Sequence, residues 1–151
     1  MNSFDNEMMK RALSLAKAAG EAGDVPVGAI LVRGEEILSE TANMCEQTRD
    51  ATAHAELLAI SKASKKLQST RLTDCTLYVT MEPCPMCAGA ILHARVGRVV
   101  YGAKDAREGA FGSLLNLPAY PLESRPEVEG GLFSDESLAL LSSFFAKRRK
   151  K

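Results

Sequence analysis

The sequence contains no tryptophan, and only 5% of its 151 residues are aromatic. It has four cysteines and two histidines, and no stretch approaches the roughly 20 consecutive apolar residues of a membrane-spanning helix. The first residues include Asp5, Glu7 and Lys10 and lack the apolar core of a secretory signal. We therefore expect a cytoplasmic protein with no membrane segment and with reduced cysteines. Any cysteine cluster then points to metal binding or catalysis rather than to disulfides.

A strong bias toward any one residue class is also missing. Hydrophobic residues make up 46% of the chain and charged residues 25%, close to the average of soluble globular domains. This composition excludes a disordered, collagen-like or coiled-coil protein. A chain of 151 residues has the size of one domain. We therefore expect a single domain over 1–151 that ends in a basic tail at 147–151.

The formal net charge is zero, with 19 basic and 19 acidic residues, which at first argues against a nucleic-acid partner. The charges are unevenly placed, however. Residues 147–151 are all lysine or arginine, so the tail carries +5 and residues 1–146 carry −5. A charged end of this kind is either a solvated tail or an interaction site, and composition alone leaves both readings open.

Apolar periodicity indicates alternating helices and strands. A first helix, capped by Ser3 or Asp5 and stopped by Gly20 and Gly23, precedes a hairpin of two strands. The patterns predict strands at 25–32, 37–43, 76–80, 96–101 and 127–132, a loop at 44–52, and later helices at 53–67, 86–94, 113–117 and from a capping Ser134 onward. Strands that alternate with helices favour parallel pairing through crossover helices.

Cys84 and Cys87 form a C-x-x-C pair at the start of a predicted helix, with Pro85 at its first position. Helix-start N–H groups favour the thiolate form that zinc binds. The pair alone also fits a redox site or two core cysteines. His54, at the start of another predicted helix, offers a third ligand. Three protein ligands leave a position open for water, which is typical of a catalytic zinc site.

Glu56 follows His54 by two positions on the same predicted helix. A carboxylate at the start of a mostly apolar helix face is costly to bury without a function. Beside a metal that lowers the pKa of its water, a carboxylate can take up a proton and pass it on. We therefore predict Glu56 as the catalytic residue. The alternative is an ordinary glutamate on a helix surface.

The segments 54–56 and 83–87 together match the H-x-E…P-C-x-x-C signature of zinc deaminases that act on nucleobases. The segments 25–29, 52–56, 77–90 and 102–106 and the pair Phe144-Phe145 extend the likeness. Over about residues 5–149 the sequence resembles the bacterial tRNA-specific adenosine deaminases. The resemblance departs at three places: Ala51 replaces a usual proline, Met81 replaces a usual leucine, and 117–129 does not match.

This resemblance implies a three-layer α/β/α fold of the cytidine-deaminase type, with a central five-stranded mixed sheet. It implies one Zn²⁺ per subunit, a homodimer, and hydrolytic conversion of adenosine to inosine at the wobble position of a tRNA anticodon. The metal ligands would be His54, Cys84 and Cys87, and Glu56 would be catalytic. The substrate-binding residues that it implies are Asn43, Val27, Gly28, Ala29, Glu82, Asp105, Phe145, Arg148 and Arg149.

The implied roles of these residues differ. Asn43 would bond the flipped base inside walls formed by 27–29, and Glu82 would help to form the pocket. Asp105 would lie near a neighbouring ribose. Phe145 and the two arginines of the last helix would face the anticodon loop.

Two other functions stay open at this stage. A deaminase of free cytosine, cytidine or guanine would use the same metal chemistry. The basic last helix and its Phe144-Phe145 end favour RNA, because a small-molecule enzyme has no need of them. A non-catalytic zinc module that binds RNA through its tail is the remaining alternative. Glu56 and the count of three ligands argue against it.

Overall fold

The computed structural model describes residues 1–122 and 124–149, and of Arg149 the backbone alone. Lys150, Lys151 and the Arg149 side chain, which belong to the predicted tail, lie outside the described residues. The strands are β1 (Gly28–Arg33), β2 (Glu36–Ala42), β3 (Cys75–Met81), β4 (Arg98–Ala103) and β5 (Glu127–Glu129). The α-helices are α1 (Ser3–Glu21), α2 (Cys45–Thr48), α3 (Ala55–Leu67), α4 (Pro85–His93) and α5 (Ser134–Arg149). Among these helices none is both long and apolar enough to cross a membrane.

The strands form one five-stranded mixed sheet in the order β2-β1-β3-β4-β5. β1 pairs antiparallel with both β2 and β3, whereas β3–β4 and β4–β5 are parallel pairs. Gly34, with φ of 61°, occupies the left-handed position in the turn between β1 and β2. The predicted hairpin and the five-stranded mixed sheet are thereby confirmed. The predicted parallel pairing holds for β3 with β4 and for β4 with β5, whereas β3 pairs antiparallel with β1.

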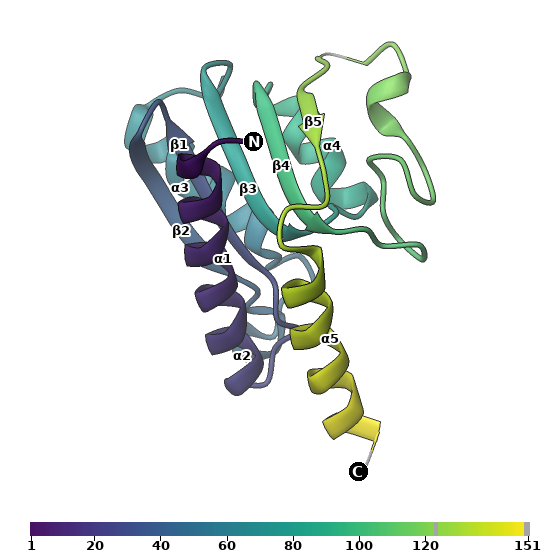
Figure 1. Cartoon of the computed structure of the whole chain (residues 1–151). Helices are drawn as coiled ribbons and strands as arrows, with labels where there is room; N and C mark the ends of the chain where they lie inside the picture. Colours follow the sequence, from purple (N-terminus) through teal and green to yellow (C-terminus); the bar gives the residue numbers. More distant parts are fainter. Residues whose placement is uncertain (123, 150–151) are drawn as a thin grey trace.

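Helices cover both faces of the sheet, as the three-layer prediction requires. α1 and α5 lie on one face, and α3 and α4 lie on the other (Figure 1). Successive side chains of β1 point to opposite faces of the sheet. Ile30 packs with Met8 of α1, and Leu31 packs in the core beneath α3. Small residues such as Ala59 on α3 let that helix approach the sheet closely.

The start of the first helix differs from the prediction. Asn2, and neither Ser3 nor Asp5, is the N-cap. The Asn2 side chain accepts a hydrogen bond from the Asp5 amide at 2.9 Å, and the Asp5 carboxylate accepts one from the Asn2 amide at 3.1 Å. This reciprocal pair satisfies two free N–H groups of the first turn. The helix also runs through Gly20 to Glu21.

Other boundaries were predicted wrongly for local reasons. The predicted loop 44–52 contains α2, and the predicted helix at 113–117 is replaced by the 3₁₀ turn η1 (Leu117–Ala119). β1 begins only at Gly28, because Pro26 has no N–H to pair. β5 is three residues long and stops before two glycines. Ser134 is the first residue of α5 rather than its cap, and the Ser137 amide donates to the Phe133 carbonyl.

Candidate active site

The structure brings the three predicted metal ligands together at two helix starts. His54 is the N-cap of α3, Cys84 is the N-cap of α4, and Cys87 lies in the first turn of α4. Their ligand atoms all lie within 4.8 Å of one another. The Nδ1 atom of His54 is 3.7 Å from Sγ of Cys84 and 3.4 Å from Sγ of Cys87. Residues 33 positions apart in the sequence thus form one cluster.

The donor set of this cluster fits a zinc ion. One imidazole nitrogen and two sulfurs are ligands that zinc prefers. Hydrogen bonds from the Cys87 side chain and from His54, together with the Cys87 backbone, lower the pKa of the Cys84 thiol to about 4. Cys84 is therefore a thiolate at neutral pH, held at a helix N-terminus that stabilises negative charge. The pKa of the Cys87 thiol is raised, because this thiol donates a hydrogen bond to Cys84 and because it is buried.

Glu56 lies buried beside this cluster. It stands in the first turn of α3, and only 4% of the residue is exposed. Burial raises the pKa of its carboxyl to about 7, although its own backbone N–H and the nearby His54 act in the opposite direction. A carboxyl group with such a pKa can take up and release a proton near neutral pH. The sequence-based alternative, a glutamate on a helix surface, is therefore wrong.

A cavity of about 670 Å³ opens over the cluster. It is large enough for a nucleobase with its sugar. The predicted site residues that line it are His54, Glu56, Cys84, Asn43, Val27, Glu82, Asp105 and Phe145. Cys87 is fully buried behind the cavity.

Asn43 connects the cavity to the start of α3. Its side-chain oxygen accepts a hydrogen bond of 2.8 Å from the Ala55 amide, one of the N–H groups that the helix itself leaves free. The residue is 8% exposed. This bond fixes the orientation of the amide plane, so that the NH₂ group is the part of Asn43 with which it can donate to a base.

Of the three residues expected to wall the pocket, only Val27 lines it. Gly28 packs against α1 instead: its amide donates to Oγ1 of Thr80 at 3.2 Å, and any Cβ on it would overlap the Ala12 carbonyl. Ala29 is fully buried in the core between the sheet and α3. The prediction for Gly28 and Ala29 thus overlooked the close packing of the sheet against its helices.

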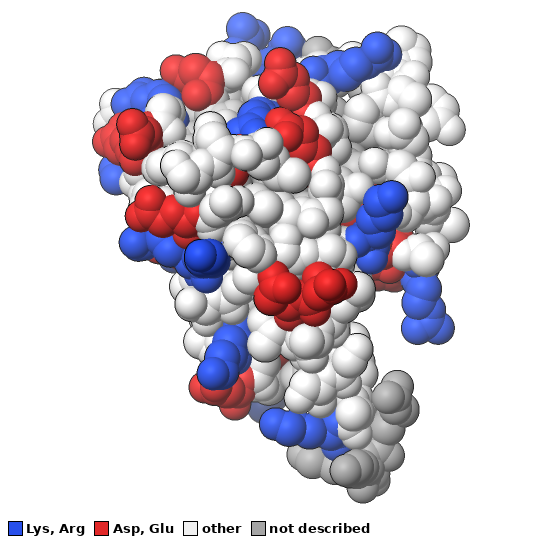
Figure 2. All heavy atoms as spheres, viewed as in Figure 1, with Lys and Arg blue, Asp and Glu red and all other residues white. Residues whose placement is uncertain are grey.

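The last helix contributes an aromatic edge to the cavity. Phe145 lines the cavity and is 43% exposed, and its ring meets that of Phe144 edge-on with centroids 5.4 Å apart. The guanidinium of Arg148 lies 5.1 Å from the centre of the Phe144 ring. In Figure 2, acidic side chains gather where α5 begins, and basic side chains lie toward its end.

Several cavity residues were not indicated by the sequence, namely Asp24, Val25, Cys45, Glu46, Met81, Arg107, Glu108 and Leu141. Asp24 accepts hydrogen bonds from the Glu46 amide at 2.7 Å and from the Gln47 side chain at 2.8 Å, and thereby attaches α2 to the cavity rim. An aspartate directly after Gly23 indicates a turn in the sequence. Its role at the cavity could not be predicted, because its hydrogen-bond partners lie 22 and 23 residues away. Cys45, which is partly buried, also lies at this rim.

Comparison with known proteins agrees with this arrangement. The model of the MafB19-like deaminase family matches residues 3–147. A tRNA-specific adenosine deaminase of Haemophilus influenzae is 45% identical, over 99% of this chain and 88% of the relative.

Two solved structures are also similar. One, from studies of A-to-I editing by tRNA:A34 deaminases, has a TM-score of 0.87 and 40% identity, and covers 89% of this chain and 99% of its own. A guanine deaminase of Bacillus subtilis has a TM-score of 0.65 and 37% identity over 99% of this chain and 95% of its own. By sequence and by fold, the chain belongs to the MafB19-like deaminases and, among them, to the tRNA-specific adenosine deaminases.

Proposed function

We propose that this chain is a zinc-dependent hydrolase that deaminates adenosine to inosine at the wobble position of a tRNA anticodon. One observation carries the proposal: the buried carboxyl of Glu56 lies in the same cavity as the cluster of His54, Cys84 and Cys87. The resemblance of the whole chain to tRNA-specific adenosine deaminases supports tRNA as the substrate.

His54, Cys84 and Cys87 would hold one zinc ion per subunit, which when bound supplies an activated water for attack on the base. Glu56 accepts a proton from that water and delivers it to N1 of the adenine. The same carboxyl then assists the departure of the C6 amino group, so that adenosine and water yield inosine and ammonia. Because the pKa of Glu56 is about 7, both proton transfers are accessible at neutral pH.

Other residues of the site bind the RNA. The Asn43 NH₂ group donates to the flipped base, Val27 packs against it, and Asp105 contacts a neighbouring ribose. The exposed ring of Phe145 offers a surface on which an unstacked anticodon base can stack. Arg148 and Arg149 meet the phosphates of the anticodon loop.

The similarity to a guanine deaminase suggests one alternative function, the deamination of a free base. A free-base deaminase would share the metal chemistry but would not use the aromatic and basic end of α5. That end lines the cavity here through Phe145. We therefore favour RNA over a free base.

One experiment separates the two functions. The protein is incubated with a tRNA pool and inosine is mapped by sequencing, while ammonia release from free guanine, cytosine, cytidine and adenosine is followed in parallel. We expect inosine at a wobble adenosine and no ammonia from the free compounds. A protein that produces no inosine in any tRNA but releases ammonia from a free base would overturn the proposal.

We also propose a homodimer. Large apolar side chains with 40–56% exposure gather on one segment after β4, namely Leu114, Leu115, Tyr120 and Leu122. Such a group marks a surface that another chain can cover. Light scattering should give twice the chain mass of 16.3 kDa. Because the similar tRNA-specific adenosine deaminase of Haemophilus influenzae is bacterial, we also propose that the enzyme acts on tRNA in the cytoplasm.

A further inference from the structure

The segment 105–113 forms one rim of the cavity. Three of its residues, Asp105, Arg107 and Glu108, line the cavity. Asp105 organises the first turn, because its Oδ1 accepts hydrogen bonds from the Arg107 amide at 3.0 Å and from the Glu108 amide at 3.2 Å. We call this segment the rim loop. Its position decides where these three side chains can meet a substrate.

The carboxylate of Glu82 holds the rim loop at both of its ends. Oε1 accepts from the Asp105 amide at 3.1 Å and from the Ser113 hydroxyl. Oε2 accepts from the Phe111 amide at 3.0 Å and from the Ser113 amide at 3.1 Å. Glu82 is only 3% exposed, so these bonds are shielded from water. Both oxygens are thus engaged twice by groups of the protein itself.

The rim loop is shaped to receive this carboxylate. A Cβ on Gly109 would lie 2.5 Å from Oε2 of Glu82 and 2.5 Å from the Asp105 carbonyl oxygen, so no larger residue fits. The next amide, that of Ala110, donates to the Pro83 carbonyl at 2.8 Å. The loop is therefore fastened to the two residues that directly precede the metal ligand Cys84.

We propose that Glu82 is a positioning residue that fixes the rim loop over the cavity, relative to the metal cluster. Its acceptor sites are taken by the loop, so it does not bind the substrate, in contrast to the role expected from the sequence. Through the loop it sets where Asp105 and Arg107 meet the RNA. That last step rests on the proposed function, whereas the anchoring of the loop does not.

The test uses Glu82→Gln and Gly109→Ala in the full-length protein. In Glu82→Gln the side chain keeps its volume, but one acceptor oxygen becomes an NH₂ donor that faces the N–H groups of the loop. In Gly109→Ala the added methyl group of the loop pushes the Glu82 carboxylate away. We expect amide hydrogen exchange of 105–113 to become about ten-fold faster in both variants, since a charged hydrogen bond contributes this much. Glu35→Gln, in the exposed β1–β2 turn, is the matched control and should leave exchange in 105–113 unchanged.

Kinetics on an anticodon stem-loop RNA provide the second readout. We expect KM to rise about ten-fold in both variants with kcat nearly unchanged and with full zinc content, because the loop positions the RNA and the catalytic carboxyl is untouched. Unchanged exchange in 105–113 would overturn the anchoring. A loss of kcat at unchanged KM would instead assign Glu82 to the chemistry. If the wild-type protein leaves every RNA unmodified, the proposed function fails, while the exchange comparison still decides the anchoring.

Discussion

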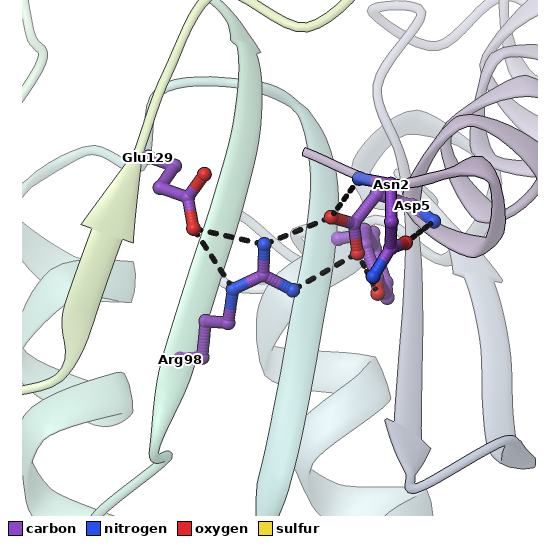
Figure 3. Close-up of polar contacts among 5 residues, drawn as sticks. Asn2, Asp5, Arg98 and Glu129 are labelled. Atoms are coloured by element: carbon purple, nitrogen blue, oxygen red, sulfur yellow. Dashed lines mark hydrogen bonds and ion pairs between the residues drawn. The ribbon is translucent and has the colours of Figure 1, made fainter.

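Arg98 on β4 holds the carboxylate of Asp5 on α1 through two parallel hydrogen bonds, each 2.9 Å long (Figure 3). The Tyr78 hydroxyl donates a third bond to Asp5 at 2.6 Å, and Arg98 also binds Glu129 of β5. Asp5 is 1% exposed. The hydrogen-bonded cluster of Asp5, Tyr78, Arg98 and Glu129 thus connects the start of α1 to the three neighbouring strands β3, β4 and β5.

Removal of the charge at Asp5 should destabilise the protein. Asp5→Asn leaves the half-buried Arg98 without one of its two acidic partners, and breaking such a pair costs about 3 kcal/mol of unfolding free energy. Urea denaturation of the two proteins measures this difference. The exposed pair of Arg11 and Glu40, at 2.7 Å, is the control. Glu40→Gln should cost less than about 1 kcal/mol, because solvent screens that pair.

The ion pair of Asp5 and Arg98 should also make the stability of the protein depend on pH in the acid range. Arg98, aided by Tyr78, holds the pKa of Asp5 well below its usual value near 4. A carboxyl whose pKa is lowered on folding contributes stability that is fully present above about pH 5 and is lost as the pH falls further. Urea midpoints from pH 7 to pH 3 should therefore fall more steeply for the wild type than for Asp5→Asn. Parallel curves for the two proteins would contradict this account.

Local patterns in the sequence sufficed for most of the elements and for the centre of the site. The turn at Gly34 predicts the hairpin, the alternation of strands and helices predicts parallel pairs, and the H-x-E and C-x-x-C spacings predict which four residues meet. The five-stranded mixed sheet as a whole was implied by the resemblance to a known family. What the sequence did not reveal depends on contacts that no local pattern encodes. Asp5 and Arg98 are 93 residues apart, and Glu82 meets partners 23 to 31 residues away. Their pairing becomes visible only once the sheet is assembled.

Glu56→Gln should separate metal binding from catalysis. The amide keeps the volume of the side chain but cannot accept and return a proton, so kcat should fall by about 10²- to 10⁴-fold. The metal ligands are untouched, and the zinc content measured by mass spectrometry should stay at one ion per chain. A variant with near-normal turnover would remove Glu56 from the proton transfers, and one that loses its zinc would make it a ligand.

Cys84→Ser should abolish tight zinc binding. A serine hydroxyl stays protonated where the Cys84 thiol, with a pKa of about 4, is a thiolate, so the site loses a charged ligand. We expect zinc to be lost to a chelator at concentrations that leave the wild type loaded. Cys45→Ser is the matched control, since Cys45 lies at the cavity rim outside the metal cluster. Equal zinc retention in both variants would refute the proposed ligand set.

Phe145→Ala tests whether the end of α5 binds RNA. Stacking of a base on an aromatic ring contributes about 1–3 kcal/mol, so KM for an anticodon stem-loop should rise about 5- to 100-fold. Leu138→Ala is the control on the same helix, because Leu138 is 45% exposed and does not line the cavity. It should leave KM unchanged. Free adenosine should yield no ammonia with the wild type or with either variant. If Phe145→Ala and Leu138→Ala behave alike on the RNA, the ring of Phe145 at the end of α5 is not part of the RNA site.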